Sequence, residues 1–557
     1  MIANNINKYK LIALIIFILI VGLFYNKNFF SLWEKLQLYT VFGPNEINYN
    51  FEFPIRGNLV NGGHLFIDIA KLFTNFLGFN LFNVKILFKI YGIISLLFFY
   101  LNLRFFVSIN SSIITTILLT INFSFLNFQN SFLIIIFGFL VSNICLYLIL
   151  SLNNRFSIFK LFLLFNLIPL ILFNYVTIQL VCIPLIIILI LKTIFYCEEK
   201  YLKNNLFYIL LFSLYILIIL FLLDPNDIYR QFLVYKNITS KELTYGFKDF
   251  YLNIHRVLES LISSNNYITN QKLYGYEPMY KFNYFNTSFN IIFFILGFLY
   301  LKRINFKNII VFTFLFLSIF PLLFSFHFNE YKYSSLSIYR LFLSFIPIYI
   351  ISSYGIELIF KKFKFSNLLI IFILLINFYY FYKSFDYLNL DFKDKMIVSY
   401  NQDSDELWER HINEINKINT VLTKLNEIHT EKNYISIKLK FNYENKIFPG
   451  DLNFIDADLD FLNTILATYL SSLQYNIFYP YNHKNYIIGI SGVGMKDNIR
   501  KFNIIDGETK YENIFFRNFK KIKNYKRIII IYYEEMQLRK FIYENNLSKD
   551  SFYEIEY

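Results

Sequence analysis

Long apolar runs separated by short polar connections fill the first 383 residues of the chain. A helix needs about 20 apolar residues to cross a hydrocarbon core ~30 Å thick, and eleven runs approach or reach that length. They lie at 9–25, 85–104, 107–126, 131–152, 156–173, 176–195, 206–223, 286–301, 308–326, 337–360 and 366–383. The pattern predicts a polytopic α-helical membrane protein. We interpret the first run as a retained helix, because it lacks an A-x-A-like cleavage site.

Hydropathy falls after Lys383, and the rest of the chain has the patterning of a water-soluble domain. Helical spacing of apolar residues and alternation of apolar with polar residues both occur there. The predicted elements are an amphipathic helix over 408–425, strands at 435–441, 486–490 and 528–533, and a helix from Asp460 through Leu473. Residues 384–557 are therefore expected to form a small α/β domain.

Composition agrees with a membrane protein, because 56% of the 557 residues are hydrophobic and only 17% are charged. The net charge of +14 is unevenly distributed. Residues 385–557 hold 23 basic and 25 acidic residues, which leaves 30 basic and 14 acidic residues for 1–384. This excess lies largely in short connections between apolar runs, as on the cytoplasmic side of a membrane. The pattern predicts an N-terminus inside, three outer segments at 26–84, 224–285 and 384–557, and no nucleic-acid partner.

The first predicted outer segment places many polar residues beside the membrane. It contains Gly43-Pro44-Asn45-Glu46, followed by Glu52, Arg56 and Gly62-Gly63-His64. The stretch from Leu65 to Leu77 collects its apolar residues on one helical face, which is typical of a helix that lies in the plane of the interface. Such a helix would hold the preceding loop close to the lipid headgroups.

This arrangement resembles the GT-C superfamily of membrane glycosyltransferases, which includes protein mannosyltransferases and lipid A aminoarabinose transferases. The shared features are a first outer segment with a carboxylate and Gly-Gly, an interfacial helix that ends in Phe76-Leu77-Gly78, and a late, proline-interrupted span with Arg340 and Pro347. The resemblance implies a bacterial inner-membrane enzyme with its transmembrane domain over 1–383. It would transfer a sugar from a polyprenyl-phosphate donor to a glycan, lipid or protein outside the cytoplasm.

The resemblance also implies roles for particular residues. Glu46 matches the acidic position that takes a proton from the acceptor hydroxyl, and Glu52 is the second candidate for this base. The leaving phosphate needs cations, and Arg340, Arg56 and Arg230 are candidates because a guanidinium can donate two parallel hydrogen bonds. The alternatives are glutamates that merely solvate the loop, an arginine that snorkels to the headgroups, and a surface ion pair.

The predicted second outer loop, residues 122–130, contains no carboxylate, although several members of the superfamily carry an acid there. Asn127, Gln129 and Asn130 are candidates for hydrogen bonds to a sugar. They are equally suited to capping the ends of two helices. His64 is a further candidate for contact with the sugar or the acceptor.

No spacing in the sequence predicts a metal site. His64, His255, His327 and Glu330 all fall in predicted outer regions, which leaves a divalent metal as an open alternative. The three cysteines show neither a C-x-x-C motif nor a disulfide framework. No other cofactor is indicated.

Three alternative functions fit a chain with many membrane spans. A polysaccharide polymerase or ligase would place its essential arginines in a late outer loop and need no acid in the first. A transporter or flippase is disfavoured, because internal repeats and charges in the middle of spans are not clear in the sequence. A non-catalytic envelope-assembly protein would tolerate substitution of Glu46, Glu52 and Arg340.

Overall fold

The structure is a computed structural model, and contacts divide the chain into two compact units. One unit contains most of the helices, and the other contains a β-sheet. The structure describes residues 2–24, 72–73, 76–77, 81–130, 135–172, 182–222, 251, 254, 257–258, 261, 284–287, 289–301, 306–323, 342–363, 365–396, 420–421, 423–425, 427–428, 433–438, 476–478, 528–532, 535–544 and 546–556.

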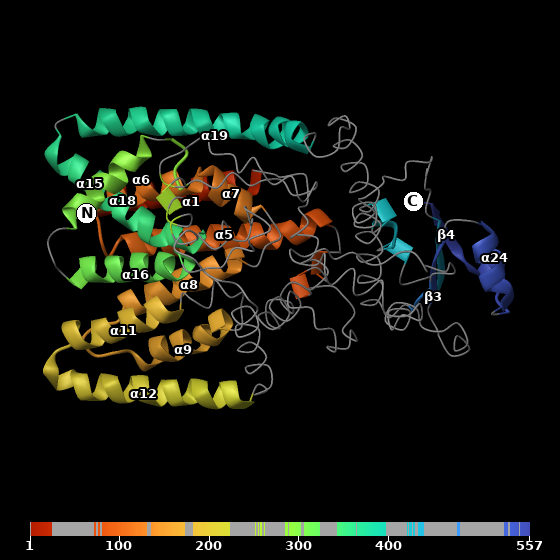
Figure 1. The fold of residues 1–557 in the computed structure, drawn as a ribbon, viewed down its shortest axis with the longest axis horizontal. Helices are drawn as coiled ribbons and strands as arrows, with labels where there is room; N and C mark the ends of the chain where they lie inside the picture. The colour runs from red at the N-terminus through yellow and green to blue at the C-terminus, as the bar shows by residue number, and fades with distance from the viewer. Residues whose placement is uncertain are drawn as a thin grey trace. The chain divides into compact units, whose positions relative to one another are not determined.

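The helical unit consists of apolar helices, many of which lie alongside one another (Figure 1). Its helices are α1 (Ile2–Phe24), α5 (Leu81–Leu103), α6 (Ile109–Thr120), α7 (Phe123–Gln129), α8 (Ile135–Leu150), α9 (Ile158–Leu172), α11 (Cys182–Tyr196), α12 (Glu199–Leu222), α15 (Asn290–Tyr300), α16 (Phe306–Leu323), the 3-10 turn η1 (Phe342–Ser344), α18 (Phe345–Lys362) and α19 (Ser366–Met396).

Four helical segments are long and apolar enough to cross a membrane: Asn7–Phe24, Lys85–Leu103, Glu199–Ile218 and Phe342–Lys362. Seven shorter apolar helices accompany them in the described part of the chain. Each of the eleven predicted runs overlaps one of these segments. The structure therefore supports a membrane protein with several spans, and the count of eleven stays a prediction.

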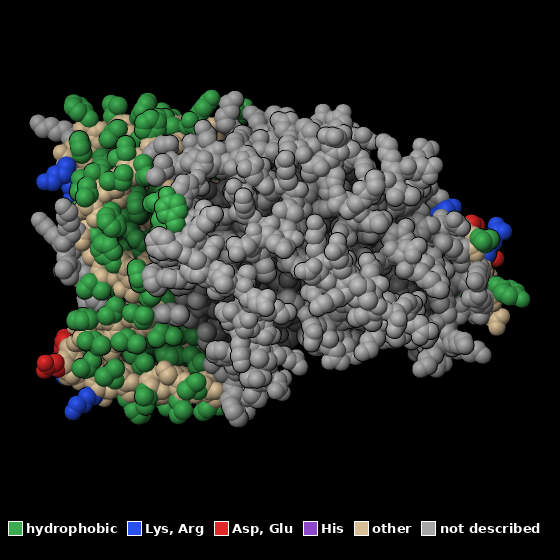
Figure 2. Space-filling view, in the orientation of Figure 1, with side chains coloured by type: hydrophobic (Ala, Val, Ile, Leu, Met, Phe, Trp, Pro, Cys, Tyr) green, Lys and Arg blue, Asp and Glu red, His purple; other side chains and the backbone are tan. Residues whose placement is uncertain are grey.

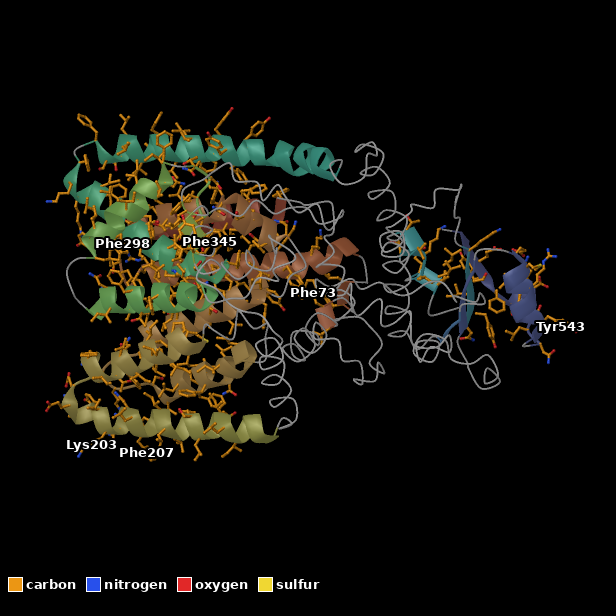
Figure 3. The ribbon with its side chains drawn as sticks, viewed as in Figure 1. Phe73, Lys203, Phe207, Phe298, Phe345 and Tyr543 are labelled. Carbon is orange, nitrogen blue, oxygen red and sulfur yellow. The ribbon has the colours of Figure 1, made fainter. Side chains whose placement is uncertain are left out.

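The helices differ greatly in how much of their surface faces the rest of the protein. In the apolar segment Phe342–Lys362, 89% of the window is buried inside the protein, whereas in Glu199–Ile218 only 17% is. Figure 3 shows Phe207 on the outer side of α12 and Phe345 among the other helices. Hydrophobic side chains cover the visible surface of these helices, and charged side chains gather at one end (Figure 2). Such an apolar outer surface suits contact with lipid.

Exposed aromatic side chains occur along α19 and just before it. Phe365 is exposed near the start of the helix, and Tyr379, Tyr380 and Tyr382 are exposed further along it. At 1.5 Å per residue, Phe365 and Tyr382 lie about 26 Å apart along the axis. Tyrosine is enriched at the surfaces of a bilayer ~30 Å thick, so the three exposed tyrosines suit a membrane interface.

The prediction of one continuous span over 107–126 is wrong. Helix α6 ends at Thr120, and the short helix α7 starts at Phe123. Asn122 separates them, because its backbone is extended and its side chain accepts a hydrogen bond from the Phe125 N–H at 2.9 Å. This is an N-cap, which satisfies one of the free donors at the start of a helix.

Pro347 does not interrupt a span, which corrects a second expectation from the sequence. It is the third residue of α18, which follows directly on η1 and continues to Lys362. The first turn of a helix tolerates proline, because its backbone N–H groups have no partner within the helix. Pro347 therefore lies at the start of α18 and leaves its interior regular.

Helices α15 and α18 approach each other so closely that their backbones touch at two glycines. A Cβ atom added to Gly355 would lie 2.0 Å from the carbonyl oxygen of Phe293, and one added to Gly297 would lie 1.8 Å from that of Ile351. Small residues allow such close packing between membrane helices, where van der Waals contact replaces the hydrophobic effect.

We expect Gly355→Leu to lower the free energy of unfolding by at least about 2 kcal/mol, because the added side chain must push α15 away from α18. Thermal unfolding of the purified protein in detergent measures this effect. Ile371→Leu, at an exposed position of α19, is the control and should leave the midpoint unchanged. An unchanged midpoint for Gly355→Leu would contradict the close crossing.

A reciprocal pair of amides joins α15 to α19. Asn290 donates to Oδ1 of Asn377 at 2.7 Å, and Asn377 donates back to Oδ1 of Asn290 at 3.0 Å. Both residues are buried. Because hydrocarbon offers no alternative partner, each amide depends on the other.

A double-mutant cycle tests this dependence. We expect Asn290→Leu and Asn377→Leu each to destabilise the protein, and the double variant to lose less than the sum of the two. The coupling should be about 0.6–1.7 kcal/mol, the range for hydrogen bonds between membrane helices. Equilibrium unfolding in detergent measures the four stabilities, and strict additivity would show that the two amides act independently.

The second unit contains a parallel four-stranded sheet in the order β2-β3-β1-β4. Its elements are β1 (Tyr434–Lys438), β2 (Asn476–Phe478), β3 (Ile528–Tyr532), α24 (Glu535–Glu544), the turn η4 (Lys549–Ser551) and β4 (Tyr553–Glu556). Strands β1 and β3 coincide with two predicted strands, and Val421 and Leu425 of the predicted amphipathic helix are helical and buried. The predicted strand 486–490 and the helix after Asp460 lie outside the described residues.

An ion pair joins α24 to the turn before β4. Lys549 Nζ lies 2.5 Å from Glu535 Oε1. This hydrogen bond, together with the nearby charges of Lys549, Lys438 and Arg539, lowers the pKa of Glu535 below its usual value. The pair lies at the surface, so it contributes little to stability. Whether this unit lies outside the cytoplasm stays a prediction.

Candidate functional site

Most of the residues predicted to act in catalysis lie outside the described part of the chain. They are Glu46, Glu52, Arg56, His64, Arg230 and Arg340, as well as the potential metal ligands His255, His327 and Glu330. The structure describes the helix α7 that carries Asn127 and Gln129, and Asn130, which follows it. The candidate site is the part of the helical unit around α7 and Asn130.

Helix α7 is held in place by polar contacts from distant parts of the chain. The Asn122 amide donates to the carbonyl of Tyr284 at 3.1 Å, and Tyr349 donates to the same carbonyl at 2.7 Å. Asn286 accepts from the Phe123 N–H at 2.9 Å and donates to the Ile121 carbonyl at 2.6 Å. Asn286 thus satisfies the backbone on both sides of the break between α6 and α7.

Aromatic packing reinforces this position. The ring of Phe342, in η1, stacks on Phe125 with centroids 5.8 Å apart and contacts Phe128 at 4.6 Å. Phe345 adds an edge contact to Phe125. The four rings are fully buried or nearly so, so α7 packs as an interior element against the start of α18. Residues 123–129 therefore form a packed helix, where the sequence predicted an amide-rich outer loop over 122–130.

Gln129 and Asn130 are both fully buried, at 0% exposure. The Gln129 amide donates to the Lys89 carbonyl at 3.2 Å, and the Asn130 amide donates to the Leu126 carbonyl at 2.8 Å. Their side-chain oxygens, Oε1 and Oδ1, accept no hydrogen bond in the structure. A buried acceptor without a donor costs about 1–3 kcal/mol, and the buried Asn102 Oδ1 also accepts no hydrogen bond.

Two glycines make room for the Gln129 side chain. A Cβ on Gly92 of α5 would lie 2.4 Å from Gln129 Cγ, and a Cβ on Gly22 of α1 would lie 2.9 Å from Gln129 Nε2. The amide therefore fits where the last turn of α1 and the middle of α5 present no side chain. Gln129 connects three helices that are far apart in the sequence.

Two lysines of α5, which the sequence analysis did not single out, lie near this amide. Lys85 and Lys89 are 3% and 6% exposed and lie one helical turn apart. The Lys89 ammonium donates to the Leu23 carbonyl at 3.1 Å. Leu23 is in the last turn of α1, where carbonyls lack partners within the helix. The sequence did contain a signal for this place, namely two lysines four residues apart within a predicted span.

A buried lysine elsewhere in the helical unit has a purely structural role. Lys192 of α11 is 4% exposed and donates to the carbonyls of Ile149 and Leu150, at 2.9 and 2.6 Å. These are the last two residues of α8, so Lys192 caps the end of that helix.

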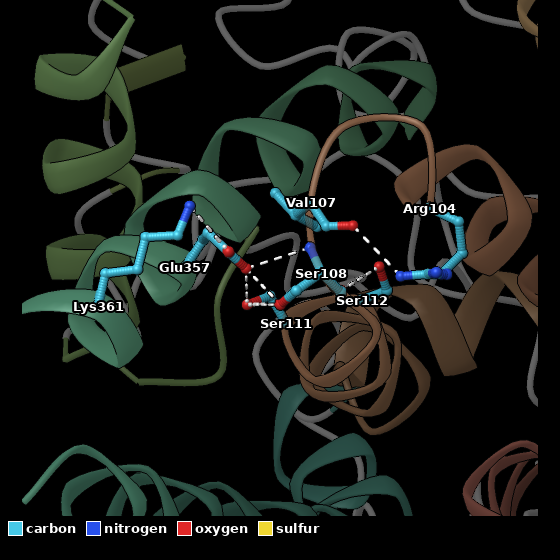
Figure 4. Close-up of polar contacts among 7 residues, drawn as sticks. All are labelled: Arg104, Val107, Ser108, Ser111, Ser112, Glu357 and Lys361. Atoms are coloured by element: carbon cyan, nitrogen blue, oxygen red, sulfur yellow. Dashed lines mark hydrogen bonds and ion pairs between the residues drawn. The ribbon is translucent and has the colours of Figure 1, made fainter. Parts of the chain in front are cut away.

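A second polar cluster joins α18 to the start of α6 (Figure 4). One carboxylate oxygen of Glu357 accepts from the Ser108 N–H at 3.2 Å, from the Ser108 hydroxyl and from the Ser111 hydroxyl at 2.6 Å. Lys361 lies 3.1 Å from the other oxygen. Arg104 in the same region donates to the Val107 carbonyl at 3.5 Å. One oxygen of the carboxylate thus joins α18 to the start of α6, while the other pairs with Lys361 on α18 itself.

We expect Glu357→Ala to destabilise the protein by about 2–3 kcal/mol, since hydrogen bonds to a charged group are worth about 1.5–3 kcal/mol. Lys361→Ala should change stability by less than about 1 kcal/mol, because its side chain is 60% exposed. Chemical unfolding in detergent compares the two. Equal effects would contradict a specific role for the contacts to Ser108 and Ser111.

Metal chemistry gains no direct support from the residues that the structure describes. Within those ranges, no group of three or more His, Cys, Asp or Glu side chains could hold a metal ion. The histidines and the glutamate proposed from the sequence lie outside them. A divalent metal therefore stays an open alternative.

Neither protein-family models nor curated proteins gave a match to this sequence.

Proposed function

We propose that this protein is a membrane glycosyltransferase of the GT-C type. It transfers a sugar from a polyprenyl-phosphate donor to a glycan, lipid or protein outside the cytoplasm of a bacterial cell. In this proposal eleven helices cross the inner membrane, the N-terminus lies inside, and residues 384–557 form an outer domain. The resemblance of the first outer segment to that superfamily suggests the reaction, and the buried polar groups of the described helices support the proposal.

One observation carries the proposal: buried polar groups gather where α1 ends, α5 begins and α7 lies. Lys85 lies in the second turn of α5 and Lys89 in the third, and Gln129 and Asn130 lie at the end of α7. The phosphate of a lipid-linked donor lies near the end of a membrane span, whereas a transporter holds its substrate near the middle of the bilayer. The position therefore favours a transferase over a transporter.

The remaining roles follow from the sequence. Glu46, with Glu52 as the alternative, removes the proton from the acceptor hydroxyl as its oxygen attacks the anomeric carbon. The bond between that carbon and the phosphate oxygen breaks, and the polyprenyl phosphate leaves with its electron pair. Arg340, Arg56 and Arg230 stabilise the charge on the leaving phosphate. Arg340 is two positions before Phe342, whose ring packs against α7.

Single-turnover sugar release from radiolabelled polyprenyl-phosphate sugars tests the proposal. We expect the purified full-length protein to release sugar in the presence of acceptors, and Glu46→Gln to reduce the rate at least about 100-fold, the usual contribution of a general base. Glu198→Gln, at an exposed acid between α11 and α12, is the control and should retain the wild-type rate.

Unfolding midpoints of the three proteins must agree, so that a lost rate reports chemistry and not folding. If no donor supports release, the transferase proposal fails, and a polymerase, ligase or assembly role takes its place. If release persists in Glu46→Gln and falls in Glu52→Gln, the donor class stands and the base is Glu52.

A further inference from the structure

Three cations lie at the end of the helical unit where α1 and α6 begin and α5 ends. Lys8 and Lys10 are in α1, Arg104 directly follows α5, and all three residues are exposed. Lys10 donates to Oδ1 of Asn110 in α6 at 2.8 Å. Arg104 donates to the Val107 carbonyl, just before α6, at 3.5 Å (Figure 4). We infer that these three cations, the cationic rim, bind the headgroups of anionic phospholipids.

The rim has no acid of its own to neutralise it. Helices α1, α5 and α6 contain neither Asp nor Glu. The contacts of Lys10 and Arg104 are with uncharged groups, and none of the three cations forms an ion pair within the described part of the chain. Glu357 of α18 reaches the start of α6, but it pairs with Lys361 at 3.1 Å. The rim therefore keeps a net positive charge that an external anion can balance.

An apolar stripe on α1 continues from the rim and suits acyl chains. Its residues follow Lys8 at intervals of three or four positions, which places them on one face of the helix. They are 39–50% exposed: Ile12, Ile16, Leu19 and Leu23. The residues of the opposite face are buried: Leu14, Ile18 and Val21. At 1.5 Å per residue, Lys8 and Leu19 lie about 16 Å apart along the axis, which is close to half of a hydrocarbon core ~30 Å thick.

This combination of charge and apolar surface favours an anionic phospholipid over other ligands. Such a lipid carries its negative charge at the membrane surface, where lysine and arginine attract it, and its chains extend from there toward the middle of the bilayer. Phosphatidylcholine has the same chains, but its headgroup brings a cation that offsets the attraction. The inference does not depend on the proposed reaction, because the rim lies at the start of α1, whereas Gln129 of α7 contacts Gly22 near its end.

Lipid binding to the purified full-length protein tests the rim. The protein in non-ionic detergent is titrated with phosphatidylglycerol or with phosphatidylcholine of identical chains, and native mass spectrometry gives the affinity of the first bound lipid. We expect phosphatidylglycerol to bind at least about tenfold more tightly, because lysine and arginine near the membrane surface each attract anionic lipid. Lys8→Gln/Lys10→Gln should weaken its binding at least fivefold and leave that of phosphatidylcholine within twofold.

A matched control removes two exposed lysines from other helices. Lys203→Gln/Lys307→Gln changes α12 and α16 by the same total charge and should leave both affinities within twofold. Asn110→Ala removes the hydrogen-bond partner of Lys10 but keeps its charge, so it should also bind phosphatidylglycerol as the wild type does. Unfolding midpoints without lipid must agree among these proteins.

Several outcomes would overturn the inference. An equal loss in the Lys203→Gln/Lys307→Gln control would make the attraction a property of all exposed lysines and not of the rim. Unchanged binding by a folded Lys8→Gln/Lys10→Gln variant would exclude these lysines, and an equal loss in Asn110→Ala would show that Lys10 acts through the contact with α6.

A measurement on the wild type does not depend on the folding of any variant. Glycerol 3-phosphate, which has a phosphate but no acyl chains, is added in excess to the complex with phosphatidylglycerol. We expect the lipid to remain bound, because the chains contact the apolar stripe. Displacement would assign the rim to a soluble anion and overturn the inference, as would equal affinities of the wild type for the two lipids.

Discussion

Each polar group buried among these apolar helices must find its hydrogen-bond partner inside the protein, because hydrocarbon provides none. Much of the helical unit can be understood from this constraint. The hydroxyls of Thr115, Thr116 and Thr120 donate to carbonyls four residues earlier in α6. Asn290 and Asn377 satisfy each other, and Lys192 satisfies the end of α8. The polar residues of the interior thus decide which helices lie together, while apolar packing decides how closely.

The position of α1 illustrates how this constraint acts over long sequence distances. Near its start, Lys10 donates to Asn110 at the beginning of α6, at 2.8 Å. Near its end, Leu23 accepts from Lys89, and Gly22 lies beside Gln129. Between these points, Phe17 contacts Phe378 of α19 with centroids 5.8 Å apart. The first apolar run therefore contacts α5, α6, α7 and α19.

The sequence predicts where apolar helices lie far better than it predicts how they meet. Run length and hydropathy located the helices because each property is local to a segment. The sequence did not predict the break at Asn122, because an Asn acts as an N-cap only where its own backbone is extended and not helical. The crossing at Gly297 and Gly355 depends on two helices more than fifty residues apart. Lys85 and Lys89 resemble ordinary boundary lysines that snorkel to the headgroups, and only the contacts with α1 and α7 reveal their burial.

The candidate site shows the same division between local and distant information. Glu46 and Arg340 were proposed from a resemblance, which is a statement about sequence patterns. Gln129 and Asn130 were proposed either as sugar contacts or as helix caps, and the structure gives each amide nitrogen a structural partner while leaving each oxygen without one. A cap at the start of a helix uses the oxygen, as Asn122 does when it accepts from Phe125, whereas a cap at the end of a helix uses a donor. Asn130 instead donates through its nitrogen to a carbonyl in the last turn of α7, and its oxygen, like those of Gln129 and Asn102, accepts no hydrogen bond.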